Sequence, residues 1–230
     1  MSGRFSQQWS NEERRRSLIA AVREWNSALK AGLPQQIQAA GRLAQICEQY
    51  GAAPASPAPD AETPSQTINR LLDFPAHRLA VYGSLAPGRK NHHMMAGMHG
   101  CWRAAMLRGS LRNEGWGAGE GFPGFLWDGT HTAVAAQVFS SPDLPHYWPR
   151  LDEFEGEEYR RILVPAEILP QQAKIGLPPH QAKSAPAGDP GLPPHQAKRA
   201  PVGDPGLAGD PEMEGGEIEI CNVYALAHED

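Results

Sequence analysis

The sequence lacks the features that mark several large classes of protein. Its three cysteines, Cys47, Cys101 and Cys221, show no C-x-x-C spacing, so they fit buried thiols in a reducing compartment better than a disulfide framework or a catalytic thiol. No segment approaches the ~20 apolar residues of a membrane span, and residues 1–10 lack the apolar part of a signal peptide. A net charge of −5, with no basic block beyond Arg14–Arg16, does not favour nucleic acid or an anionic membrane as a partner. We therefore expect a cytoplasmic protein that binds neither.

The 22 prolines and 24 glycines are spread unevenly and divide the chain. Residues 52–66 are rich in alanine and proline, which predicts a linker. Between 170 and 216 the sequence GLPPHQAK occurs at 176–183 and again at 191–198, and no aromatic residue follows Pro170 in this stretch. This composition predicts a disordered loop inserted between two strands, with a proline-motif docking site as the alternative. The expected organisation is a helical hairpin at 1–51, the linker at 52–66, and a domain at 67–230 that the loop at 170–216 interrupts.

The first 51 residues predict two amphipathic helices. The first begins at the capping pattern of residues 10–13 and ends at Gly32; the second begins near Pro34 and ends at Gly51. Two short helices cannot bury both apolar stripes by themselves. We therefore expect the hairpin to pack on the main domain, on a second copy of itself, or on a partner protein, and a structural appendage is the preferred interpretation.

The segment from Leu79 to Leu85 has strand character, but Gly83-Ser84 interrupts it. Such a break lets neighbouring backbone N–H groups converge, so that they can hold a carboxylate or a developing oxyanion. The alternative is a plain turn from strand to loop. The other elements expected in the domain are a short helix at 91–98, a strand at 102–111, a glycine-rich loop at 114–125 that could approach a ligand closely, a strand at 132–139, a helix at 142–154, and strands at 159–168 and 217–226.

A cluster of acids follows the helix expected at 142–154, namely Asp152, Glu153, Glu155, Glu157 and Glu158. A solvated helix end is the plain interpretation, although acids there face the negative end of the helix dipole. Glu155 follows Leu151 by four residues and so lies beside the apolar face, whereas Asp152 and Glu153 point away from it. A carboxyl group held against Leu151 and Phe154, near like charges, should have a raised pKa, which suits a proton shuttle near neutral pH.

A metal site is not expected. His92, His93, His99 and Cys101 lie close together in the sequence, but their spacing does not match a zinc ligand set and no second ligand pair follows. Loop and packing roles account better for these side chains.

Taken together, these segments resemble the γ-glutamylcyclotransferase-like superfamily, which includes avirulence-induced-gene-like and γ-glutamylamine cyclotransferase-like domains. The resemblance implies an α+β fold in which a small, mostly antiparallel bent sheet or barrel carries a few helices, preceded here by the α-helical hairpin. It covers Arg78–Ile168 and the last strand. The motifs that carry it, in the order of the family, are Val81-Tyr82-Gly83-Ser84-Leu85 with Pro87-Gly88, Phe122-Pro123-Gly124, Leu151-Asp152-Glu153-Phe154-Glu155-Gly156, Tyr159-x-Arg161 and Val223-Tyr224.

The resemblance also implies a reaction, in which Glu155 is the general acid and base of a γ-glutamylcyclotransferase. The α-amine of a small γ-glutamyl substrate attacks its own γ-carbonyl group and releases 5-oxoproline and a free amine, with no metal or other cofactor required. In this scheme the backbone N–H groups of Gly83, Ser84 and Leu85 hold the substrate.

Tyr82, Tyr159 and Tyr224 are further candidate pocket residues, although packing of strand aromatics explains them equally well. Arg161 could pair with a carboxylate or neutralise the acidic cluster. The alternative function is a catalytically inactive protein that retains the fold and binds partners through the hairpin and the proline-rich loop.

Overall fold

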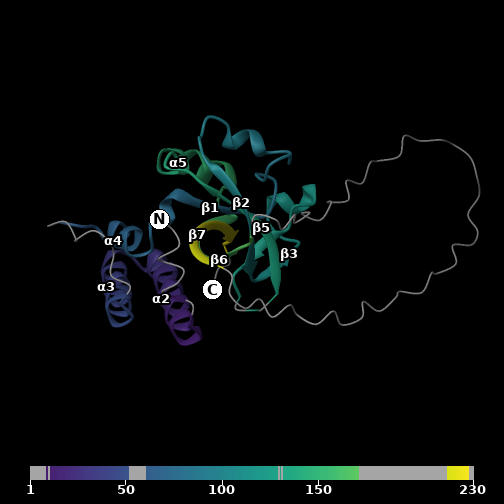
Figure 1. Ribbon diagram of the computed structural model, residues 1–230. Coiled ribbons are helices and arrows are strands. Elements are labelled where there is room, and N and C mark those ends of the chain that lie inside the picture. The colour runs from purple at the N-terminus through teal and green to yellow at the C-terminus, as the bar shows by residue number, and fades with distance from the viewer. Residues whose placement is uncertain are drawn as a thin grey trace, which may run out of the picture.

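The computed structural model describes residues 9, 11–51, 61–128, 130, 132–170 and 217–227 of the chain (Figure 1). These residues form a closed barrel in the strand order β1-β5-β2-β6-β7, in which neighbouring strands are antiparallel except for β1 and β7. The expected α+β fold with a mostly antiparallel sheet or barrel is therefore confirmed. The barrel strands are β1 (Arg78–Val81), β2 (Cys101–Arg108), β5 (Ala133–Ser140), β6 (Tyr159–Ile168) and β7 (Glu217–Leu226).

The strand β7 is covered on both faces, and nine of its ten residues are buried. Cys221, Val223 and Ala225 enter the apolar interior of the barrel, whereas Ile220 faces the N-terminal helices and Tyr224 packs near α5 (Leu144–Glu155). The alternation along the sequence predicted the strand, but it did not indicate that both faces would be covered.

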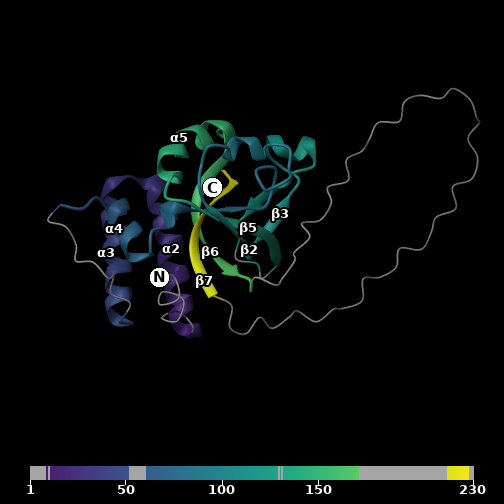
Figure 2. The same ribbon diagram turned by 45° about the horizontal axis from the view of Figure 1, so that its top comes forward.

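The N-terminal helices α2 (Glu12–Ala31) and α3 (Leu33–Gln49) form the expected hairpin, and α2 runs beside β6 and β7 (Figure 2). The side chain of Asn26 anchors it: its Nδ2 donates to the Leu163 carbonyl group at 2.7 Å, and the Leu163 N–H donates to its Oδ1 at 3.0 Å. Of the three packing partners considered above, the structure shows the main domain. No helix among the described residues combines the length and the apolar character needed to cross a bilayer.

A short helix, α4 (Pro64–Leu71), follows the segment predicted as a linker. It begins at a capping box formed by Thr63 and Gln66, and it packs with the hairpin through Ile68 and Leu71. Residues 52–60 of the expected linker lie outside the described residues, as does the duplicated stretch at 171–216.

The strand predicted at 102–111 is wrong in its extent, because it breaks at Gly109. A Cβ atom at this position would lie 2.5 Å from the Leu126 carbonyl oxygen, so only glycine fits here without a clash. Beyond it, β3 (Ser110–Arg112) leaves the barrel and pairs with β4 (Gly124–Leu126).

Two expected helices also differ from the prediction. The helix expected at 91–98 is a 3₁₀ turn, η2 (His92–Met95), and the one expected at 142–154 is α5, which begins at Leu144 and reaches Glu155. The remaining short elements are the 3₁₀ turns η1 (Pro75–His77) and η3 (Trp116–Glu120).

Candidate active site

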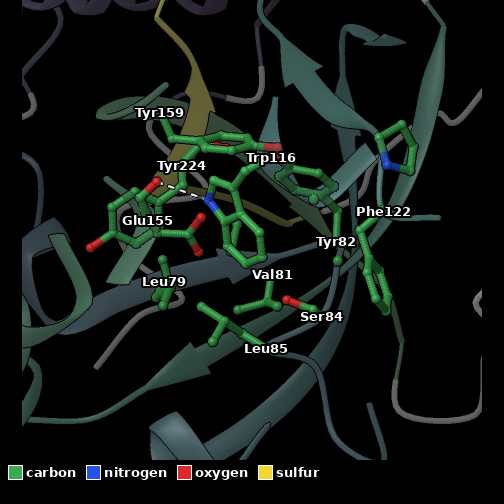
Figure 3. Close-up of a pocket in the computed structure, with 14 residues that line it drawn as sticks. Leu79, Val81, Tyr82, Ser84, Leu85, Trp116, Phe122, Glu155, Tyr159 and Tyr224 are labelled. Carbon is green, nitrogen blue, oxygen red and sulfur yellow. Dashed lines mark hydrogen bonds between the residues drawn. The ribbon is translucent and has the colours of Figure 1, made fainter. Parts of the chain in front are cut away.

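One cavity lies at the end of β1, between the barrel, α5 and the glycine-rich loop (Figure 3). It contains all seven residues predicted to form a site, which come from segments up to 142 residues apart in the sequence. No lysine, arginine or histidine is among the described residues that line it. The lining residues are Leu79, Ala80, Val81, Tyr82, Gly83, Ser84, Leu85, Trp116, Gly117, Phe122, Pro123, Glu155, Tyr159 and Tyr224.

The turn at Gly83–Leu85 lines this cavity. Its carbonyl groups are occupied: Gly83 O accepts from Ala86 N at 3.3 Å, and Ser84 O accepts from Asn91 N at 3.0 Å. Leu85 O lies 2.9 Å from His92 Nδ1, and since a carbonyl oxygen only accepts, this nitrogen carries the proton. The N–H groups of the three turn residues donate to no other described residue, so they are available to a bound carboxylate or oxyanion.

The turn is fixed from behind by Asn91, which is buried. Besides its backbone bond to Ser84, the Asn91 side chain donates from Nδ2 to Ser84 Oγ at 3.0 Å. A turn that is held in this way keeps its N–H groups in place before a ligand arrives, which is the condition for effective electrostatic stabilisation.

Glu155 is the last residue of α5 and is 9% exposed. Burial raises the pKa of its carboxyl group from the ordinary glutamate value to about 7. The direction of this shift agrees with the prediction, but neighbouring acids do not cause it, since Asp152 and Glu153 are exposed. A carboxyl group with a pKa near neutrality can both accept and donate a proton under ordinary conditions.

The hydroxyl groups of all three tyrosines in the cavity are hydrogen-bonded within the chain, that of Tyr159 to the backbone of Gly117. Tyr82 Oη accepts from Phe125 N at 3.0 Å and donates to the Tyr224 carbonyl group at 2.9 Å. Tyr224 Oη donates to Asp152 Oδ1 at 2.7 Å. Burial raises the pKa of Tyr82, Tyr159 and Tyr224, so all three phenols are uncharged near neutral pH. Tyr82 and Tyr224 therefore contribute ring surface to the cavity rather than a free hydroxyl group.

Arg161 does not line the cavity, and it pairs with the acidic cluster instead. Its Nε and one terminal nitrogen donate to the two carboxylate oxygens of Asp152 at 3.0 and 3.1 Å. Its guanidinium group also lies over the ring of Trp148, 4.4 Å from the centroid. Asp152 thus holds both Arg161 and Tyr224, a role that the sequence did not indicate.

Trp116 is the main residue of the cavity that sequence reasoning missed. Its indole Nε1 donates to the backbone carbonyl group of Glu155 at 3.0 Å. The available signal was an aromatic residue between two glycines in a loop, Gly115-Trp116-Gly117, which indicates close packing of the backbone around one large ring. Among the described residues there is no cluster of histidine, cysteine or acidic side chains that could hold a metal ion.

The closed barrel thus has one cavity whose lining includes both the buried carboxyl group of Glu155 and the turn at Gly83–Leu85. Residues 79–184 match the family described as "Gamma-glutamyl cyclotransferase, AIG2-like". The resemblance that the motifs predicted is confirmed by this match. The chain matches no curated protein.

Similar solved structures include YkqA from Bacillus subtilis, at 18% sequence identity and a TM-score of 0.37 over 66% of this chain and 36% of that one. The chain therefore spans little more than a third of YkqA. They also include an AIG2-like protein from Mus musculus, at 17% identity and a TM-score of 0.40 over 67% of this chain and 79% of that one. A solution structure of A2LD1 is 19% identical, with a TM-score of 0.39 over 67% and 80% of the two chains.

Proposed function

We propose that this protein is a γ-glutamylcyclotransferase, which releases 5-oxoproline and a free amine from a γ-glutamyl amine, peptide or amino acid. The observation that supports this proposal best is the position of Glu155 and of the free N–H groups of Gly83–Leu85 in one cavity. An intramolecular acyl transfer needs a group that moves a proton and donors that accept negative charge on oxygen, and the cavity supplies both.

In the proposed reaction, the Glu155 carboxylate takes a proton from the α-ammonium group of the substrate. The resulting amine attacks the γ-carbonyl carbon, and the carbonyl oxygen becomes an oxyanion. When the oxyanion collapses, the bond to the leaving nitrogen breaks and the protonated Glu155 gives that nitrogen its proton. The new ring nitrogen loses its second proton through the regenerated Glu155 carboxylate, and the released amine takes this proton up and leaves as an ammonium. Because nucleophile and carbonyl belong to one molecule, holding the substrate in a bent conformation supplies much of the acceleration.

The lining of the cavity restricts how an anionic substrate is held. Among the described residues no cationic side chain lines the cavity, so the substrate carboxylate or the oxyanion binds to the N–H groups of Gly83, Ser84 and Leu85. The aromatic rings of Tyr82, Tyr159 and Tyr224 surround the aliphatic part of the γ-glutamyl group.

The proposal is tested by incubating the purified protein with a panel of γ-glutamyl amines, peptides and amino acids and measuring 5-oxoproline. Glu155→Gln removes the proton carrier and keeps the shape, so we expect kcat to fall by about 10²–10⁴-fold. Glu153→Gln is the matched control, since it removes an exposed acid of the same helix and should retain activity. Equal product formation by the Glu155 variant and the unmodified protein would rule out the proposed mechanism.

A second candidate is a binding protein that keeps the fold without turnover. The observation that favours it is a group of exposed apolar residues near the turn of the hairpin: Leu29 is 37% exposed, Leu33 59% and Ile37 58%. Self-association or binding of a protein partner would cover these side chains. This function predicts no 5-oxoproline from any substrate, together with partner or self-association that is lost when the three residues are replaced by serine.

A further inference from the structure

The loop that carries Trp116 brings one indole against the end of α5. Besides its hydrogen bond to the Glu155 carbonyl group, the ring stands edge-on to Phe154, with centroids 5.4 Å apart and planes at 89°. It is also edge-on to Tyr159, with centroids 6.4 Å apart. Figure 3 shows the indole next to the side chain of Glu155. One side chain thus connects a loop, the catalytic end of a helix and a barrel strand.

The backbone on either side of Trp116 leaves the ring little freedom. Gly115 has φ = 85°, and a Cβ atom there would lie 2.4 Å from the Tyr159 hydroxyl oxygen. At Gly117 a Cβ atom would lie 3.1 Å from the Phe122 carbonyl oxygen. The glycines let the loop pack closely against β6. Trp116, the residue of this segment that has a side chain, therefore extends over Glu155.

The exclusion of water is the main influence on the protonation of the Glu155 carboxyl group, as the charges of the surrounding groups show. The titratable groups that face it are Tyr82, which follows β1, Tyr159 from β6 and Tyr224 from β7, all uncharged near neutral pH. On its own helix Asp152 is paired with Arg161, and on the loop Glu120 pairs with Lys90 at 2.5 Å. The remaining loop acid is Glu114, and it is exposed. Within the part of the chain that the structure describes, no lysine, arginine or histidine lines the cavity to favour the carboxylate.

We propose that Trp116 is a positioning residue for Glu155: its indole N–H fixes the end of α5, and its ring closes the cavity over the carboxyl group against water. The catalytic consequence rests on the proposed function, but the effect on the carboxyl group does not. Burial as the cause of the raised Glu155 pKa agrees with this role. Removing the ring admits water, which solvates the carboxylate and makes Glu155 an ordinary acid.

The test is a direct titration of the Glu155 carboxyl group by ¹³C NMR on the full chain, with Glu155→Gln to assign the signal. We expect an apparent pKa of about 7 in the unmodified protein. In Trp116→Ala it should fall by at least about one unit toward the ordinary glutamate value. Trp116→Phe keeps one ring but loses the N–H group, so a smaller shift in the same direction is expected. Trp102→Phe is the control, because Trp102 packs on Phe139 away from the cavity and its replacement should leave the titration unchanged.

An unchanged Glu155 titration in Trp116→Ala would overturn the proposal. If that variant does not fold, Trp116→Phe decides in the same way, since an unchanged titration there means that the indole does not influence the carboxyl group. With a turnover substrate, the acid limb of the kcat/KM profile should move with the titration, whereas a merely structural defect lowers the rate without moving the limb. Absence of 5-oxoproline from the unmodified protein contradicts the proposed function alone, because the NMR titration needs no turnover.

Discussion

The hydroxyl group of Tyr82, the residue that follows β1, donates a hydrogen bond to the backbone carbonyl group of Tyr224 in β7 at 2.9 Å. The same oxygen accepts from the N–H group of Phe125 in β4 at 3.0 Å. A residue of the family motif therefore holds three strands together at the wall of the cavity. Its hydroxyl group has a structural task, and the chemistry of the cavity depends on the neighbouring backbone and on Glu155.

Tyr82→Phe should destabilise the fold. The variant leaves a buried N–H group of Phe125 and a buried carbonyl group of Tyr224 without their partner, which costs about 1–3 kcal/mol in the free energy of unfolding. Chemical denaturation measures this difference. Tyr147→Phe is the matched control, because its hydroxyl group bonds to no other described residue and should change the stability by less than about 0.5 kcal/mol. Equal stability of the two variants would mean that the Tyr82 hydrogen bonds contribute nothing net.

Glu155→Gln should stabilise the folded protein at alkaline pH. The folded-state pKa of Glu155 is raised to about 7, so the folded protein binds more protons than the unfolded chain between about pH 4.5 and 7. Below the pKa that Glu155 has in the unfolded chain, the ionisation of Glu155 therefore does not reduce the free energy of unfolding. As the pH rises toward 7, the free energy of unfolding decreases. Glutamine resembles the protonated acid and avoids this loss, which amounts to about 3 kcal/mol at most.

The measurement is the free energy of unfolding of both proteins at pH 8 and at pH 4.5. We expect Glu155→Gln to be the more stable protein at pH 8 and equal to the unmodified protein at the lower pH. Glu153→Gln should show no such difference, since Glu153 is exposed. A stability difference that does not depend on pH would contradict burial of an ionisable carboxyl group at this position.

Much of the barrel could be predicted from the sequence, because apolar and polar residues alternate in some of its strands and clear turn residues end others. β6 and β7 have the predicted bounds, since β7 begins with alternating acidic and apolar residues and loop residues flank both strands. The strand predicted at 102–111 was wrong because the break at Gly109 depends on contact with Leu126, which lies in another strand. Periodicity describes one segment at a time and contains no information about such a contact.

In the candidate site, too, the residues that belong to local sequence motifs could be predicted, whereas contacts between distant segments could not. Glu155 and the Gly83–Leu85 turn were predicted from motifs, and the structure places them in one cavity. The Gly115-Trp116-Gly117 pattern is a signal for close packing, but the position of the Trp116 ring could not be predicted, because a loop has no periodic pattern and the ring is placed by the contacts of Gly115 with Tyr159. The hydrogen bond between Tyr224 and Asp152 was missed for a related reason, since it joins residues 72 positions apart on a helix and a strand.

Asp152→Ala should lower the turnover proposed for the cavity through Tyr224. Asp152 accepts hydrogen bonds from Tyr224 Oη and from Arg161, so its removal frees a ring that lines the cavity. We expect kcat/KM to fall about tenfold, the effect of losing one hydrogen bond to a positioned group. Asp152→Asn keeps an acceptor for Tyr224 and should retain most of the activity. Unchanged kcat/KM in the alanine variant would show that the position of Tyr224 does not limit the reaction.

Asn26→Ala should weaken the attachment of the hairpin to the barrel. Asn26 makes two hydrogen bonds to the backbone of Leu163, and without them both Leu163 groups lose their partner at a partly buried site. The expected cost is about 1–3 kcal/mol in the free energy of unfolding. Ser27→Ala is the matched control, because the Ser27 hydroxyl group donates only to Arg23 O on the exposed side of α2. Hydrogen exchange should show faster exchange of the Leu163 amide and of the hairpin in Asn26→Ala, while the barrel amides at β5 keep their protection. If exchange accelerates equally throughout, the hairpin and the barrel unfold as one cooperative unit, and the bond from Asn26 stabilises the whole molecule rather than a separable attachment.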